Sequence, residues 1–126
     1  MEVVGTKAPE VLSATTMIGD KVFNSEGKEL GKLEELMLDL DRGCIAYAVL
    51  SFGGILGMGD KLFAIPWEAM RLDTDRHAFI LNVNKDKLKD APGFDKHHWP
   101  ETDESIDRAK WLSEVYTYYG YEPYWK

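Results

Sequence analysis

The residues best suited to binding a metal ion lie between residues 95 and 103. His97 and His98 follow Asp95 and precede further carboxylates. Imidazole nitrogens and carboxylate oxygens are common ligands of transition metals. However, adjacent histidines cannot share one helix face, and no two histidines stand four residues apart, as a helical zinc pair requires. We therefore treat Asp95, His97 and His98 as weak metal candidates and expect no cofactor.

A glycine-rich segment, residues 53–60, has the composition of a phosphate-binding loop but not its spacing. Gly59 is followed by Asp60 and then Lys61, where a P-loop needs Lys and then Ser or Thr. The segment also lies between two expected strands, so no helix follows it to offer an amino terminus to a phosphate. Its apolar side chains instead suggest a contact surface with another protein, made by Ile55, Leu56 and Met58.

A nucleophilic active site would need Ser, Cys or Thr beside a general base. Ser51, Cys44 and His77 fall in or beside expected strands, and no Gly-x-Ser-x-Gly turn occurs. A triad assembled in space leaves no trace in a sequence, so the pattern disfavours an enzyme without closing that alternative. We expect no catalysis, and we expect the single cysteine, Cys44, to be a buried and inert thiol.

The charge balance argues against two classes of partner. The formal net charge is −7, and a field of that sign repels nucleic-acid phosphates and anionic lipid headgroups. No apolar run approaches the length that spans a bilayer, and residues 1–10 lack the pattern of a signal peptide. We therefore expect no nucleic acid, no membrane insertion and a cytoplasmic location.

Short β-strands separated by turns must position most of these residues. The chain has 126 residues, of which 44% are hydrophobic, enough for one domain with one core. Short runs rich in β-branched and aromatic residues, with turn signals between them, predict a mainly β fold such as a small barrel or sandwich. The expected strands are residues 21–23, 30–40, 45–52, 62–66, 67–72 and 78–83.

The stretch 30–40 fits two periodicities, because its leucines match both a helical stripe and one face of a strand. We choose the strand, since a turn at 41–43 and the β-rich run 45–52 follow directly and together predict a hairpin. The period-2 pattern then predicts one buried set of side chains, comprising Leu36, Leu38, Leu40, Ala46, Ala48, Leu50, Ile65, Phe79 and Leu81.

The last third of the chain is helical and rich in aromatic residues. Asn84 is expected to cap a short helix, and a longer helix is expected over 103–119, with Gly120 as its carboxyl-terminal cap. The aromatic rings either pack over the strands or form an interface with another protein, and a symmetric dimer would satisfy both readings. The aromatic interface candidates are Trp67, Trp111, Tyr118, Tyr124 and Trp125.

One ordered set of short motifs resembles a known family. It begins with Ile18-Gly19-Asp20-Lys21-Val22 and continues through Asn24, Gly27 and Leu30-Gly31-Lys32-Leu33. The turn Asp41-Arg42-Gly43 and the glycine-rich segment before Phe63-Ala64-Ile65-Pro66-Trp67 complete it. Together these motifs resemble the PRC-barrel domain over residues 13–84, and the segments that follow are similar to extensions on bacterial members.

The resemblance implies a small β-barrel used for assembly and protein contact, with no established catalysis. The family includes the cytoplasmic barrel of the photosynthetic reaction centre H subunit and the carboxyl-terminal barrel of a ribosome maturation factor. We therefore expect a flexible arm (1–12), a PRC-barrel-like domain (13–84) and a helical extension (85–126).

The expected function is that of a non-catalytic assembly module that forms a homodimer and binds an unidentified protein partner. The alternative is a small-ligand or metal-binding protein, or an enzyme, with a pocket between barrel and extension.

Overall fold

The computed structural model describes residues 1–6, 11–52 and 61–125. The strands in these ranges are β1 (Glu2–Val4), β2 (Lys21–Phe23), β3 (Glu29–Asp39), β4 (Cys44–Phe52), β5 (Lys61–Ile65), β6 (Met70–Asp73), β7 (Ala78–Leu81) and β8 (Gly93–Asp95). The helices are α1 (Ala14–Met17), the 3-10 turn η2 (Trp67–Ala69), α2 (Lys85–Lys89) and α3 (Arg108–Tyr119). The prediction of a mainly β fold with a helical extension is confirmed.

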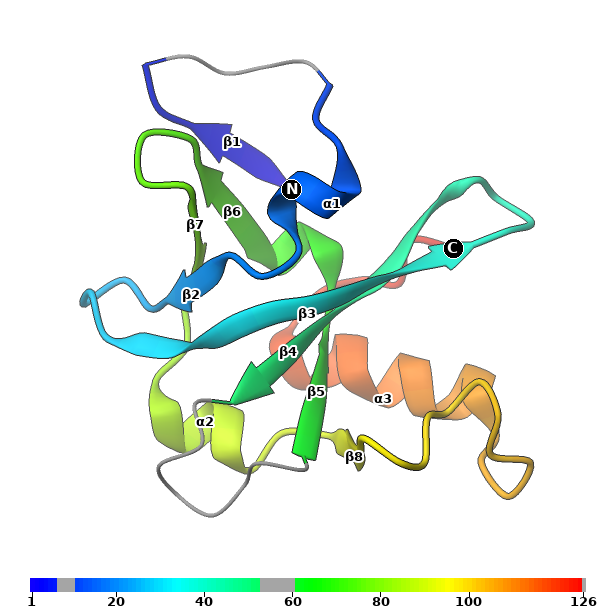
Figure 1. Ribbon diagram of the computed structural model, residues 1–126. Coiled ribbons are helices and arrows are strands. Elements are labelled where there is room, and N and C mark those ends of the chain that lie inside the picture. Colours follow the sequence, from blue (N-terminus) through cyan, green and yellow to red (C-terminus); the bar gives the residue numbers. More distant parts are fainter. Residues whose placement is uncertain (7–10, 53–60, 126) are drawn as a thin grey trace.

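All eight strands belong to one sheet with the order β1-β6-β7-β2-β3-β4-β5-β8 (Figure 1). Neighbouring strands run antiparallel except for two pairs, β1 with β6 and β2 with β7, which are parallel. Both parallel pairs join strands that are far apart in the chain, and they place β6 and β7 between β1 and β2 in the sheet. The longest pairing is the β3–β4 hairpin, which extends beyond the body of the molecule in Figure 1.

The hairpin confirms the strand prediction for 30–40 but not all of its buried face. Leu38 and Leu40 are exposed by 63% and 89%, so the prediction that they are buried is wrong. The register shifts between Met37 and Leu38, where Ala46 on the opposite strand has no partner. This β-bulge lies on β4, whereas Leu38 is exposed because it stands next to the last residue of β3, and Leu40 lies in the turn that follows. The other seven predicted core residues are buried.

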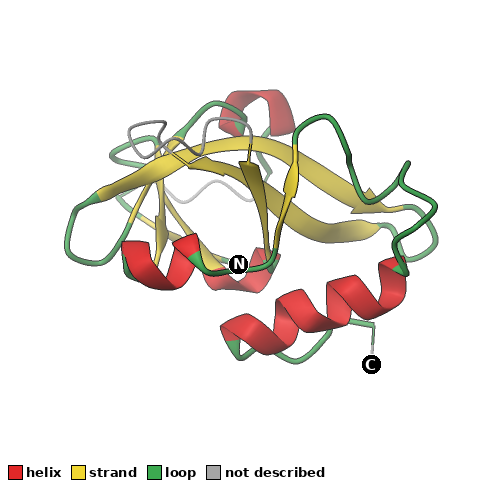
Figure 2. Cartoon of the chain, turned by 90° about the horizontal axis from the view of Figure 1, so that it is seen from below, coloured by secondary structure: helices red, strands yellow, loops and turns green. Residues whose placement is uncertain are grey.

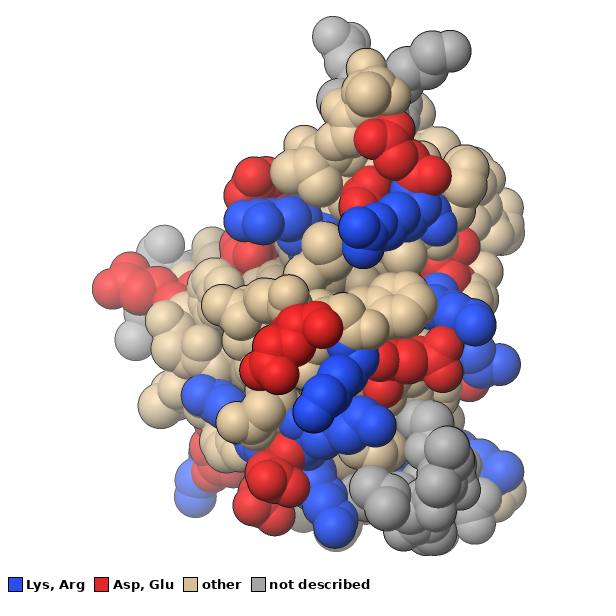
Figure 3. Space-filling view, turned by 90° about the vertical axis from the view of Figure 1, so that its left-hand side faces the viewer, with Lys and Arg blue, Asp and Glu red and all other residues tan. Residues whose placement is uncertain are grey.

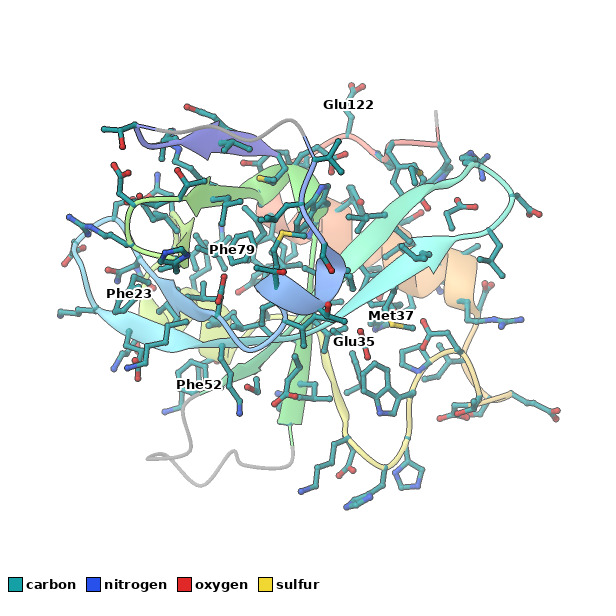
Figure 4. All side chains as sticks on the ribbon, turned by 45° about the horizontal axis from the view of Figure 1, so that its top comes forward. Phe23, Glu35, Met37, Phe52, Phe79 and Glu122 are labelled. Atoms are coloured by element: carbon teal, nitrogen blue, oxygen red, sulfur yellow. The ribbon has the colours of Figure 1, made fainter. Side chains whose placement is uncertain are left out.

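The core is formed by buried side chains from the strands and from α3, many of them leucine and aromatic residues. Phe63 and Phe79 are fully buried, and Figure 4 shows Phe79 in the middle of the strands. Trp67 packs on Phe79 with ring centroids 6.0 Å apart. The expected strand 67–72 begins only at Met70, because η2 intervenes directly after Pro66, whose fixed φ suits the start of a helical turn.

Part of the expected amino-terminal arm is held by the sheet. Residues 2–4 form β1, and the Glu2 carboxylate lies 3.2 Å from the Arg71 guanidinium. The Thr6 hydroxyl donates to the Asp75 carboxylate at 2.8 Å. A strand of three residues carries too little periodicity to be recognised without its distant partner.

The extension folds against its own strands. Asn84 caps α2 as predicted, its side chain accepting from the Lys87 amide at 2.7 Å. The longer helix begins later than expected, at Arg108, because Asp107 is its amino-terminal cap. Gly120, with a φ of 78°, ends it as predicted. Figure 2 shows α3 as a separate layer along one side of the strands, with Val115, Tyr116 and Tyr119 buried.

Candidate functional site

A groove of about 500 Å³ lies between the end of the β3–β4 hairpin and the extension. The alternative reading of the sequence located a pocket at this junction of barrel and extension. Its walls come from the hairpin, from the segment before α3, from α3 itself and from the tail. The lining residues are Asp39, Asp41, Arg42, Ala46, Tyr47, Pro100, Glu101, Arg108, Ala109, Trp111, Leu112, Tyr124 and Trp125.

The floor of the groove is fixed by a tyrosine from α3. Tyr116 is fully buried, and its hydroxyl donates to the Ala46 carbonyl oxygen at 2.7 Å. Ala46 is the residue that the bulge leaves without a cross-strand partner. A buried backbone carbonyl needs a donor, so the hydroxyl satisfies a group that the sheet does not pair and ties α3 to β4 at this point. Burial raises the pKa of Tyr116 above its ordinary value, and the hydroxyl therefore stays protonated as a donor.

A second tyrosine joins the tail to the hairpin. The Tyr124 hydroxyl donates to Oδ2 of Asp39 at 2.7 Å, and Oδ1 of Asp39 accepts from the backbone amides of Asp41 and Arg42. The Tyr124 hydroxyl and the Arg42 amide hold the pKa of Asp39 below its ordinary value of 3.8. Burial and the Asp39 carboxylate raise the pKa of Tyr124. This hydrogen bond is therefore strongest when Asp39 is ionised.

A third tyrosine holds the segment before α3. The hydroxyl of Tyr47, on β4, donates to a carboxylate oxygen of Glu101. The edge of the Trp111 ring meets Tyr47 with centroids 5.5 Å apart. Burial, with Glu101 adding to it, raises the pKa of Tyr47. Arg108 donates from Nη1 to the Glu101 backbone oxygen at 3.3 Å. The groove is thus built from tyrosine–carboxylate pairs and aromatic walls.

In these contacts, two carboxylates of the groove are partners of tyrosine hydroxyls. Asp39 and Glu101 act as acceptors for tyrosine hydroxyls, and the pKa of Asp39 is lowered. A carboxyl group serving as a general acid would instead need a raised pKa. Cys44 is exposed at the start of β4, so the prediction of a buried thiol is wrong. The reason is that Cys44 is the first residue of β4, directly after the turn of the hairpin, and the buried residues of β4 begin only at Ala46.

The weak metal candidates do not assemble into a ligand set. His98 Nδ1 lies 3.9 Å from Asp95 Oδ1, whereas His97 contributes its backbone amide to the same carboxylate, at 2.8 Å. Within residues 1–6, 11–52 and 61–125, no three histidine, cysteine or carboxylate side chains gather as metal ligands.

The aromatic interface candidates divide into two groups. Trp111, Tyr124 and Trp125 line the groove. Trp67 packs on the core, and the Tyr118 hydroxyl donates to the Lys87 carbonyl oxygen at 2.6 Å. All five make contacts within the chain itself. Ile55, Leu56 and Met58 lie outside the described residues.

An exposed apolar surface lies on the other side of the hairpin from the groove. Asp39 points into the groove, and successive side chains of a strand point to opposite faces, so Leu38 points away from it. Ile45 is the cross-strand partner of Leu38, and Leu40 follows in the turn. We name Leu38, Leu40 and Ile45 the outer hairpin face. Leu38 and Leu40 are exposed and Ile45 is half-buried; the period-2 pattern of the sequence did not predict this face, because it assigns both leucines to the buried side of the strand.

Charged side chains elsewhere are mixed in sign. On the face shown in Figure 3, lysines and arginines alternate with aspartates and glutamates. Ion pairs among the described residues include Lys21 with Glu29 at 3.2 Å and Arg76 with Asp73 at 3.6 Å.

The sheet, the hairpin and the groove define a small β-module with a helical extension. The model of the PRC-barrel domain family matches residues 9–88, which is more than half of the chain, so the chain belongs to this family. No curated protein matches the chain. The segment that carries α3 and most of the groove-lining aromatic residues lies beyond the matched range. In the described part of the chain, none of the helices is both long and apolar enough to cross a membrane.

Proposed function

We propose that the chain is a non-catalytic protein-binding module of PRC-barrel type that associates with a second copy of itself. The observation that carries the proposal is the outer hairpin face, where Leu38 and Leu40 are 63% and 89% exposed. Adjacent exposed apolar side chains on a projecting hairpin are typical of protein contact sites. Membership of the PRC-barrel domain family supports a small β-module as the scaffold.

The size of this face predicts weak, concentration-dependent association. In a two-fold dimer each chain contributes the same residues, so Leu38 and Leu40 of both chains would leave water together. Burying a leucine contributes roughly 1.5–3 kcal/mol, and four of them contribute about 6–12 kcal/mol. Association costs about 4–15 kcal/mol in lost freedom. The two terms are similar, so a dimer should form at micromolar or higher concentrations and not be permanent.

The hydrogen bonds made by the carboxylates of the groove support the non-catalytic part of the proposal. The groove has the volume of a small-ligand pocket, which favours the alternative of a ligand-binding protein. However, the carboxylates of Asp39 and Glu101 are acceptors for Tyr124 and Tyr47. Carboxylates that are hydrogen-bonded to tyrosine hydroxyls are suited to holding the extension against the hairpin. We therefore favour a binding role for the groove over a catalytic one.

Light scattering across a concentration series tests self-association. The variant Leu38→Ser/Leu40→Ser should remain a monomer at concentrations where the unaltered chain forms dimers. Val11→Ser is the matched control, since Val11 is also exposed, by 86%, but lies outside the hairpin. It should associate like the unaltered chain. Equal association of the double variant and the unaltered chain, or a monomer at every concentration for both, would overturn the proposal.

A further inference from the structure

We propose that the groove between the hairpin and the extension binds an extended, proline-containing peptide that carries a basic residue. The inference rests on the proposed protein-binding function and deepens it, because it names the chemistry of a partner. It does not depend on the outer hairpin face, which lies on the other side of the hairpin. The two surfaces could therefore be occupied at the same time.

The walls of the groove have the character of a proline-binding surface. Four aromatic rings line it, and they come from three separate parts of the chain: Tyr47 from β4, Trp111 from α3, and Tyr124 and Trp125 from the tail. Pro100 and the α3 residues Ala109 and Leu112 complete the apolar lining. Extended proline-rich segments dock in aromatic-lined grooves, because their rings fit between flat side chains and little conformational freedom is lost on binding.

The rings are fixed in place before any ligand arrives. Trp125 and Tyr124 meet edge to face with centroids 5.0 Å apart, and Trp125 also contacts the buried Tyr116 at 5.3 Å. Trp111 is held against Tyr47 and Phe94. Because the side chains are already ordered, binding would cost little additional entropy.

The charge of the groove selects a basic peptide. Three carboxylates line it, from Asp39, Asp41 and Glu101, against the two guanidinium groups of Arg42 and Arg108, which leaves an excess of one negative charge. Arg42 is already paired with Asp39 at 3.3 Å. Asp41 is exposed and lines the groove, and Glu101 contacts Tyr47 through Oε1. The chain's net charge of −7 adds to this preference.

Intrinsic tryptophan fluorescence measures the binding directly, because Trp111 and Trp125 line the groove. The probe is a short synthetic peptide of alternating proline and alanine with arginines at one end. Two comparison peptides have glutamate in place of the arginines, or glycine in place of the prolines. We expect saturable binding of the first peptide and affinities at least tenfold lower for the other two, since each loses one class of contact.

Variants locate the site. Asp41→Lys should weaken binding by about tenfold, because it replaces an attractive charge with a repulsive one. Glu26→Lys is the matched control: Glu26 is also an exposed acid in a turn next to β3, but at its opposite end, and binding should be unchanged. Trp111→Phe keeps a ring against Tyr47 and should weaken binding while the chain stays folded by circular dichroism.

Equal binding of all three peptides, no binding of any, or equal losses in Asp41→Lys and Glu26→Lys would overturn the inference. Failure of the peptide to bind a chain that still self-associates would refute the groove proposal alone. Conversely, peptide binding by a chain that stays monomeric would leave the groove proposal standing and refute self-association.

Discussion

The hydroxyl of Tyr116 offers the sharpest test of how the extension is attached. In Tyr116→Phe the ring remains between α3 and the strands, and only the hydrogen bond to the Ala46 carbonyl is removed. The ring keeps its contacts with Tyr124 and Trp125, whose centroids lie 5.9 and 5.3 Å away. Any loss of stability therefore measures the bond between helix and bulge, with little change in packing.

The structure sets the expected magnitude. Tyr116 is fully buried, so water cannot replace the lost donor, and leaving a buried acceptor without a partner costs about 1–3 kcal/mol. Tyr118→Phe is the matched control: its hydroxyl also donates to a backbone carbonyl, that of Lys87, but in an exposed setting. Water can take over there, and the cost should stay below about 0.5 kcal/mol.

Urea and thermal unfolding, followed by circular dichroism, measure both variants. A loss of 1–3 kcal/mol lowers Tm by roughly 3–15 °C in a domain of this size, whereas Tyr118→Phe should melt within about 2 °C of the unaltered chain. If Tyr116→Phe is as stable as the unaltered chain, or if Tyr118→Phe is the more damaging change, the bond to Ala46 does not hold α3 in place and the reasoning fails.

Two further predictions concern the hairpin. Gly31→Ala should destabilise the fold by about 2–4 kcal/mol, because a methyl group there would clash with the Ser51 backbone carbonyl on β4; urea unfolding measures it, and a loss below 1 kcal/mol would contradict it. In Tyr124→Phe the pKa of Asp39 should rise toward its ordinary value of 3.8, as followed by NMR of the carboxyl carbon. Because the pKa of Asp39 is lowered in the folded chain, the bond's stabilising effect should be complete at neutral pH and be lost as the pH falls below about 4. An Asp39 titration that is unchanged in the variant would rule out this pair as the cause.

Much of the fold could be predicted from turns and caps. The turn at 41–43 settled the strand assignment of 30–40 against its helical stripe, and Asn84 and Gly120 marked real helix ends. These signals are local, because each depends on the side chain and backbone of a few neighbouring residues. They need no knowledge of distant parts of the chain.

The wrong predictions concern features that depend on tertiary contacts, namely which side chains are buried and where a helix begins. Leu38 fitted a buried face, but it lies near the turn end of the β3–β4 hairpin, where its side chain is 63% exposed. Asp103 resembled the start of a helix, yet Asp107 provides the cap. Competing helix caps differ in free energy by about 1 kcal/mol, and the packing of the rest of the chain decides between them.

The sequence singled out several of the aromatic residues that line the groove, but not the polar contacts that hold it together. The aromatic residues of the extension were expected to pack or to form an interface, and Trp111, Tyr124 and Trp125 do line the groove. Glu101 was considered only as one of the carboxylates near His97 and His98, and Arg108 was not anticipated, since it lies in an exposed polar stretch with no motif. Their role follows only from Tyr47, which is 54 residues away from Glu101 in the chain.

The parallel pairing of β1 with β6 also determines when the sheet can be completed during synthesis. Glu2 lies opposite Arg71, and these residues are 69 positions apart. At about 5–20 residues per second on the ribosome, the first strand would wait roughly 3–14 s for its partner to be made. The β3–β4 hairpin is complete well before that. Strand β1 is thus synthesised before its partner β6 and stays unpaired with it throughout that interval.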